Sequence, residues 1–143
     1  MAQDPAARET VIEFGGPVPV TVEGDGVSVT FSAEIAATPE QQQRGMMWRE
    51  EMRDDQAMLF LYGAPQQINM WMRNTLISLD IVFIDEDGEI VKIIAGAQPL
   101  SRRLLRSDFP AVAVLESRGG YALEAGIRPG HFVRHEAFGD PEG

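Results

Sequence analysis

Short runs of β-branched and apolar residues, separated by turn residues, make up most of the chain. The clearest alternation spans Val27 to Ile35, where every second residue is apolar and the residues between are polar, which predicts a half-buried strand. Further strands are expected at residues 10–14, 18–22, 57–62, 68–72, 79–84, 89–96, 111–116 and 131–135. About nine short strands predict a mainly β fold, an antiparallel β-sandwich or a partly closed, jelly-roll-like barrel.

One or two short helices accompany the strands. Thr38 can cap a helix, Pro39 suits its first position, and Gln41 stands where a capping box needs it, so a helix should begin here and end at Gly45. Shorter helical pieces are expected at residues 48–52 and 119–125.

Length and composition predict one domain with a real core. The chain has 143 residues, of which 44% are hydrophobic. We expect the domain at residues 10–138, between a disordered tail at residues 1–9, which are polar and contain Pro5, and a second tail at residues 139–143.

Charge and residue usage exclude several classes of function. A net charge of −10 argues against a nucleic-acid partner, and we interpret the cluster Arg102, Arg103 and Arg106 as solvated loop arginines. The absence of cysteine excludes disulfides and thiolate chemistry, and no apolar run is long enough to span a bilayer. The small polar residues 2–7 are typical of a mature exported protein, so we expect a periplasmic or otherwise exported protein, with a cytoplasmic one as the alternative.

Methionine and histidine are the residue types of this chain that favour soft or borderline metal ions. Seven methionines without cysteine are compatible with a thioether copper site, although adaptable core packing is the commoner role of methionine. His131 and His135 lack a carboxylate that would complete a zinc site, and we interpret them as surface histidines. The sequence predicts no metal and no cofactor.

Four blocks in order resemble the family known as domain of unknown function 192. They are Thr38-Pro39-Glu40 leading to Arg44-Gly45-Met46-Met47-Trp48-Arg49, then Met58-Leu59-Phe60, then Trp71-Met72-Arg73-Asn74-Thr75 through Leu79-Asp80, and Val114-Leu115-Glu116. The chain departs from the family pattern at Ala57, Ser78 and His131. The resemblance implies a compact, mainly β fold and no established activity.

Two carboxylates stand in apolar strands. Asp80 lies in a run whose other residues are apolar on both faces, and Glu116 ends a second such run. A carboxylate in such a position needs partners. For Asp80 these could be the turn at residues 74–78 or the guanidinium of Arg44 or Arg73, which would make it a structural staple. If Asp80 and Glu116 faced each other across a cleft, they could instead serve a hydrolase as acid and base.

The side chains of Trp71, Arg73 and Asn74 could form a recognition surface. An aromatic plane, a charged fork and an amide suit a small polar ligand such as a sugar, a carboxylate or a peptide end. We therefore expect a ligand-binding or accessory domain rather than an enzyme. Its candidate site comprises Arg44, Trp71, Arg73, Asn74, Asp80 and Glu116. A hydrolase and a module that pairs through a sheet edge are the alternatives.

Overall fold

The computed structural model describes residues 3–138, so the tail expected at residues 139–143 lies outside the described residues. The strands are β1 (Gly15–Gly24), β2 (Val27–Ala36), β3 (Gln56–Gln66), β4 (Asn69–Met70), β5 (Leu79–Ile84), β6 (Ile90–Ala97), β7 (Leu105–Arg106), β8 (Ala111–Arg118) and β9 (Phe132–Arg134). The helices are α1 (Pro39–Arg44), α2 (Tyr121–Glu124) and a 3₁₀ turn at Glu136–Phe138.

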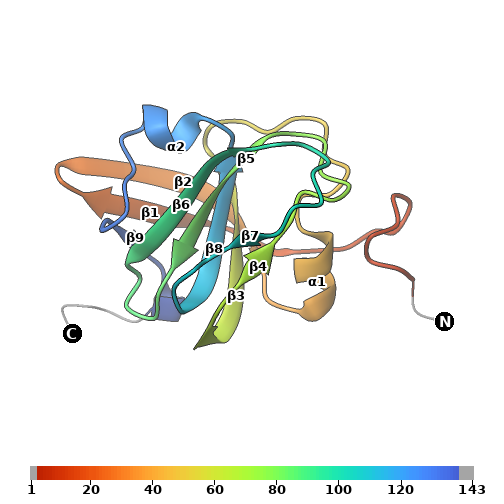
Figure 1. Cartoon of the computed structure of the whole chain (residues 1–143), viewed down its shortest axis with the longest axis horizontal. Helices are drawn as coiled ribbons and strands as arrows, with labels where there is room; N and C mark the ends of the chain where they lie inside the picture. The colour runs from red at the N-terminus through yellow and green to blue at the C-terminus, as the bar shows by residue number, and fades with distance from the viewer. Residues whose placement is uncertain (1–2, 139–143) are drawn as a thin grey trace.

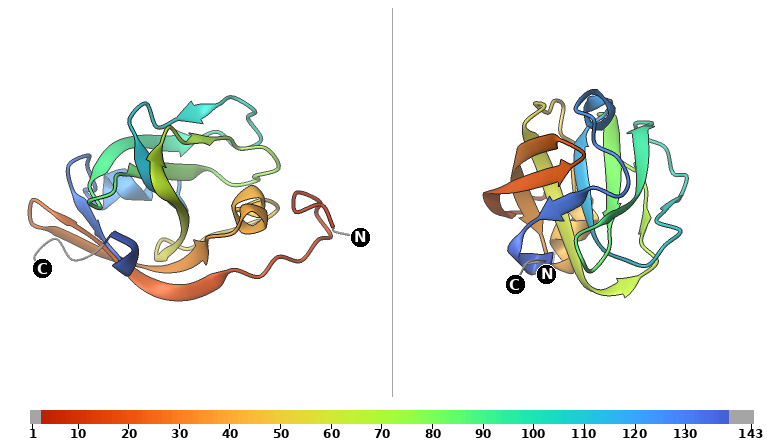
Figure 2. Two further views of the ribbon diagram at one scale, coloured as in Figure 1. Left: turned by 90° about the horizontal axis from the view of Figure 1, so that it is seen from below. Right: turned by 90° about the vertical axis from the view of Figure 1, so that its left-hand side faces the viewer.

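Seven of these strands form one curled sheet, in the order β6-β5-β8-β3-β2-β1-β9, and β4 pairs with β7 in a short separate ribbon. Figures 1 and 2 show the sheet wrapping around its core, with α1 and α2 near its two ends. Its neighbours are antiparallel except β2 and β3, which run parallel. A bridge between Glu89 and Phe132 joins the start of β6 to β9. The expected mainly β, partly closed barrel is confirmed.

Both faces of the central strands are buried. All six residues of β5 are buried, and so are the first seven of β8. On β5, Leu79, Ile81 and Phe83 pack into one apolar cluster, while Val82 and Ile84 pack into a second one. The alternation of a strand sends consecutive side chains to opposite faces, so the sheet separates two cores.

The predicted helix at Thr38 is confirmed in detail. Gln41 N donates to Thr38 Oγ1 at 3.2 Å, and the Gln41 side chain accepts from Thr38 N at 3.0 Å. The helix expected at residues 48–52 is wrong. Trp48 has a left-handed φ of 70°, which ends helical geometry after the turn.

Two strand predictions also need correction. Residues 10–14 are not a strand, because the pairing with β2 begins only at Gly15, opposite Ile35. Gly15 to Pro17 belong to β1 itself, where a register shift accommodates them. The strand expected at residues 68–72 is reduced to the two residues of β4.

His131 is not a surface residue. Its side chain is 3% exposed, its Nε2 lies 2.9 Å from Asp25 Oδ2, and its Nδ1 accepts from Arg128 N at 3.2 Å. A Cβ at Gly24 would lie 2.4 Å from the imidazole, so glycine there makes room for the ring. The ring thereby joins the β1–β2 turn to the segment that precedes β9.

Candidate functional site

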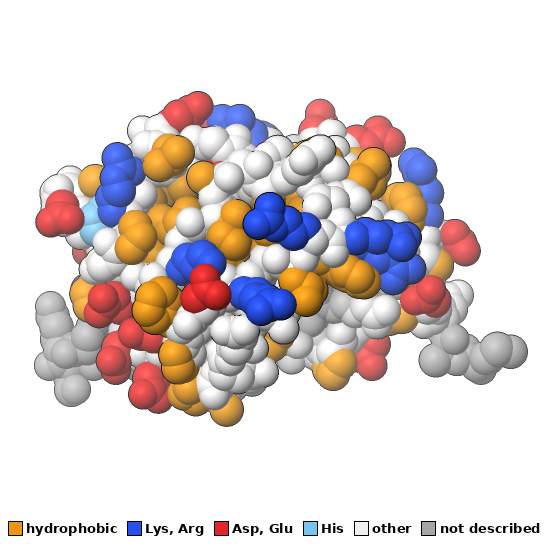
Figure 3. Space-filling model, in the orientation of Figure 1, with side chains coloured by type: hydrophobic (Ala, Val, Ile, Leu, Met, Phe, Trp, Pro, Cys, Tyr) orange, Lys and Arg blue, Asp and Glu red, His pale blue; other side chains and the backbone are white. Residues whose placement is uncertain are grey.

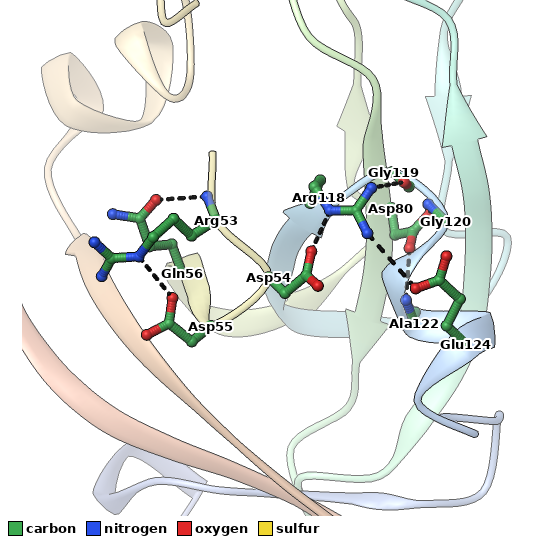
Figure 4. Close-up of polar contacts among 10 residues, drawn as sticks. All are labelled: Arg53, Asp54, Asp55, Gln56, Asp80, Arg118, Gly119, Gly120, Ala122 and Glu124. Carbon is green, nitrogen blue, oxygen red and sulfur yellow. Dashed lines mark hydrogen bonds and ion pairs between the residues drawn. The ribbon is translucent and has the colours of Figure 1, made fainter. Parts of the chain in front are cut away.

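Asp80 is fully buried, and three backbone amides hold its carboxylate. Oδ1 accepts from Gly96 N at 2.8 Å and from Gly120 N at 3.0 Å, and Oδ2 accepts from Ala122 N at 2.8 Å. Figure 4 shows the carboxylate of β5 pointing at the start of α2. The N-cap of α2 is Gly120, which has no side chain, so Asp80 supplies from another strand the acceptor that a capping side chain would otherwise provide.

These partners are not the ones that the sequence suggested. Neither the turn at residues 74–78 nor Arg44 or Arg73 donates to Asp80 in the described structure. Arg118 lies nearby on the surface and forms ion pairs with Asp54 and, at 3.6 Å, with Glu124 (Figure 4). Asp80 thus connects β5 to β6 and to α2 through the hydrogen bonds that its carboxylate oxygens accept.

Asp80 and Glu116 do not form an acid/base pair. Asp80 is the register partner of Ser117, and Ile81 is the register partner of Glu116. Register partners point to the same side of a sheet and neighbours in sequence point to opposite sides. The two carboxylates therefore lie on opposite faces of the sheet, and the hydrolase mechanism proposed for this pair is wrong.

Glu116 lies in a pocket on its own face of the sheet. We call it the Glu116 pocket; its volume is about 270 Å³. Its lining comes from residues 42–47 at the end of α1, Phe60 and Tyr62 of β3, residues 69–71, Thr75 and Glu116. Glu116 is 3% exposed, and its carboxylate accepts no hydrogen bond from residues 3–138. Its oxygens are not fully enclosed by protein, since Arg73 Nε is the one completely enclosed, unpartnered side-chain nitrogen or oxygen among those residues. A buried carboxyl group with no protein partner is costly, and such groups often mark a site.

Burial dominates the electrostatics of this pocket. Removal from water raises the pKa of Glu116 from 4.5 to about 8, against the opposing effect of the Arg49 charge. The Arg49 guanidinium is shared with Glu34, to which both of its terminal nitrogens donate. Burial, and secondarily Glu116, also raises the pKa of Tyr62 above its ordinary value. At neutral pH both groups are therefore predominantly uncharged.

Trp71 lines the Glu116 pocket and is 42% exposed. The Arg73 guanidinium stacks on the Trp71 ring with its carbon 5.5 Å from the ring centre. Arg73 Nε is buried without a hydrogen-bond partner among the described groups. The Trp71 side chain is partly exposed, as expected. Arg73 packs against its ring but is not one of the residues that line the pocket.

Arg44 and Asn74 hold the amino-terminal segment. Arg44 Nη1 donates to Ala7 O at 2.6 Å and to Pro5 O at 3.2 Å, and Asn74 Nδ2 donates to Ala6 O at 3.4 Å. Trp48 Nε1 also donates to Ala6 O, at 2.9 Å. Nothing in the composition of residues 1–9 predicted these contacts. Of the six candidates, the structure brings Arg44, Trp71 and Glu116 to one pocket and places Asp80 on the opposite face.

Sequence reasoning missed Tyr62 and the methionines at this site. Tyr62 OH donates weakly to Met70 Sδ at 3.6 Å, and Met46, Met47 and Met70 all line the pocket. A signal was available for Tyr62, because it follows Phe60 by two residues and so shares its face.

Within residues 3–138, no three side chains of His, Asp or Glu converge as a metal site would require. None of the helices described there has the length and apolar character to cross a bilayer.

The fold and the site define a small, partly closed β-barrel domain with a pocket beside a buried carboxyl group. The chain belongs to the DUF192 family, described as an uncharacterized ACR, whose model matches residues 20–135. This confirms the resemblance seen in the sequence.

Two solved structures are similar. One, from Sinorhizobium meliloti 1021, is described as a proposed transcription regulator; it has 31% identity and a TM-score of 0.85, and covers 90% of this chain and 99% of its own. The other, from Novosphingobium aromaticivorans DSM 12444, is of unknown function, with 36% identity, a TM-score of 0.81, and 94% and 99% coverage. No curated protein matches this chain.

Proposed function

We propose that this protein is a small-ligand-binding domain, that the Glu116 pocket is its binding site, and that the ligand carries a protonated amino group. One observation carries the proposal: Glu116 is almost fully buried, its carboxyl oxygens accept no hydrogen bond from the described residues, and the residue lines a pocket. The pocket lies near the lower end of the usual size range of about 300 to 1,000 Å³, which favours a small ligand.

The walls of the pocket favour a cation over an anion. Phe60, Tyr62 and Trp71 present aromatic surface, which attracts an ammonium group placed over a ring. Arg44, the guanidinium at the rim, already donates to backbone carbonyls of residues 5–8. An amino group would supply a positive charge beside Glu116 in addition to that of Arg49, which is already paired with Glu34. Among the polar ligands that the sequence suggested, the amino end of a peptide fits best.

Binding of such a ligand should release a proton. Glu116, with its pKa raised to about 8, is mainly protonated in the empty pocket at pH 7, and a bound ammonium group would favour the ionised form. The affinity for an alkylamine should therefore increase about tenfold per pH unit up to pH 8 and level off above it, whereas the affinity for the amino end of a peptide, whose own pKa is about 8, should fall again above pH 8. An anionic ligand that accepts the carboxyl proton would show the opposite trend.

Calorimetry with matched ligand pairs tests the proposal. Amines and amino-terminal dipeptides would be compared with their N-acetylated forms, and sugars, carboxylates and Cu(I) would complete the panel. We expect heat only from free amines, with about one proton released, and loss of binding in Glu116→Gln but not in the control Glu86→Gln, which changes an exposed hairpin residue. Binding of the acetylated form as tightly as the amine, or unchanged binding by Glu116→Gln, would contradict it. So would binding of Cu(I) alone.

Two other roles have less support. The described edge strands are β6 and β9, and hydrogen bonds from Ile90 N to His131 O and from Val133 N to Gly88 O join them where the barrel closes. This shortens the free edge that a partner strand would need. A role in transcription, as in the description of the S. meliloti relative, is not favoured by a net charge of −10.

Location outside the cytoplasm remains part of the proposal. Its support is the small, polar composition of residues 2–7. Fractionation of cells that express the natural gene, followed by immunodetection, tests it, and recovery only with cytoplasmic markers would contradict it.

A further inference from the structure

The loop between β6 and β8 combines positive charge with exposed apolar side chains. Residues 98–109 contain three of the twelve Lys and Arg residues of the chain and one acidic residue, Asp108. Leu100, Leu104 and Phe109 are 58%, 49% and 53% exposed. Exposed large apolar side chains are unfavourable in water. Their concentration on one loop of an acidic protein indicates a surface that binds a partner.

A second segment of the chain joins this loop. Met70 pairs with Leu105 in the β4–β7 ribbon, and Met72 N donates to Ser101 O at 3.0 Å. Trp71 lies between these two contacts and is itself 42% exposed. The indole ring therefore lies beside the loop and extends its apolar surface.

The arginines around this surface have no acidic partners. They are Arg73, Arg102, Arg103 and Arg106. No carboxylate of residues 3–138 lies within ion-pair distance of any of them, whereas Lys92 on the neighbouring strand pairs with Asp108. Figure 3 shows this face with Lys and Arg groups over its middle and right, hydrophobic side chains and an acidic group among them, and the other acidic groups toward its edges.

We propose that this basic apolar patch, made of Trp71, Arg73, Leu100, Arg102, Arg103, Leu104 and Arg106, docks the protein onto an anionic lipid surface. Exposed Trp and Leu beside Arg match the interface between headgroups and acyl chains. A nucleic acid would satisfy the arginines but would leave the leucines without an apolar partner. The acidic remainder of the molecule opposes docking only weakly, because charges more than about 10 Å away are screened at 0.1 M salt.

Co-sedimentation with vesicles tests the patch. We expect the full chain to sediment with phosphatidylcholine vesicles that contain phosphatidylglycerol, and not with phosphatidylcholine alone. The triple variant Arg102→Gln, Arg103→Gln, Arg106→Gln should lower the partition coefficient at least tenfold, since each basic residue near such a surface contributes about a fivefold factor. A control triple variant, Arg8→Gln, Arg53→Gln, Arg134→Gln, makes the same change in net charge elsewhere and should keep at least half of the binding.

Insertion of the apolar part needs a separate readout. In a Trp48→Phe background the remaining tryptophan is Trp71, and its fluorescence should be quenched by brominated lipid. Leu100→Ser with Leu104→Ser should reduce that quenching and the partition coefficient. The proposal is overturned if brominated lipid leaves Trp71 fluorescence unchanged, if both triple variants lose binding equally, or if a DNA duplex or an acidic peptide competes the protein off the vesicles at equal charge concentration.

Discussion

Replacing Asp80 by Asn should destabilise the fold far more than the same chemical change at Glu116. Both residues are buried acids in central strands, at 0% and 3% exposure, and both variants keep the shape of the side chain. They differ in what their oxygens contact. The pair of variants therefore separates a carboxylate that holds the fold together from one that faces a pocket.

The magnitude follows from the three amides that hold Asp80. An Asn side chain keeps one oxygen, which can still accept from Gly96 N and Gly120 N, but its NH₂ group would face Ala122 N. Two donors that face each other leave at least one buried N–H unsatisfied, at about 1 to 3 kcal/mol, and the two remaining bonds lose their charge assistance. We expect Asp80→Asn to lower the free energy of unfolding by about 3 kcal/mol.

Glu116→Gln should change that free energy by less than about 1 kcal/mol at pH 4, where Glu116 is mainly protonated in both the folded and the unfolded chain and has no hydrogen bond to lose within the described structure. At pH 7 the variant should be more stable than the parent chain by up to about 3 kcal/mol, because only the parent chain must then bind a proton on folding. Urea unfolding followed by circular dichroism measures both variants, with unchanged slopes confirming two-state behaviour. Equal losses in the two variants would refute the assignment of separate roles, as would a stable Asp80→Asn.

Three further outcomes are expected. The free energy of unfolding should fall as pH rises from 4.5 to 8, because the folded state binds the Glu116 proton more tightly than the unfolded chain does, and this effect should end above pH 8. The loss is at most about 5 kcal/mol. Urea unfolding across this pH range should show the loss in the parent chain and not in Glu116→Gln. Arg44→Ala should release residues 5–8 and speed the amide exchange of residues 6–8 at least tenfold, measured by hydrogen exchange, whereas unchanged exchange would mean that these contacts are negligible. Thr38→Ala should lower the free energy of unfolding by about 1 kcal/mol, measured by thermal unfolding, because α1 loses its cap. The control Thr30→Ala, at an exposed strand position, should lower it by less.

Local patterns predicted much of the fold. The capping box at Thr38 and the strand of residues 79–84 are encoded within a few neighbouring residues, and the structure has both where the sequence placed them. Residues 10–14 have the composition of a strand and are not one. A strand needs a neighbouring strand to pair with, and the neighbour, β2, ends at Ala36. The composition of residues 10–14 does not predict where β2 ends.

The candidate site was predictable by position and less so by role. Two acids in apolar strands were correctly marked as unusual, but which face each occupies depends on the register between β5 and β8. That register separates Asp80 from Glu116 and removes the paired mechanism. The partners of Asp80, at Gly96, Gly120 and Ala122, are backbone groups, and a sequence does not reveal which distant amides will converge on a carboxylate.

The position of β8 has a consequence for synthesis of the chain. This strand lies between β3 and β5 in the sheet, yet it is encoded after both of them. Until residues 111–118 have left the ribosome, β3 and β5 each have an unpaired, strongly apolar edge. Such edges associate readily with other chains, and non-local strand pairing is slow. The nascent protein therefore depends on protection by chaperones, or on rapid completion of translation, until its central strand arrives.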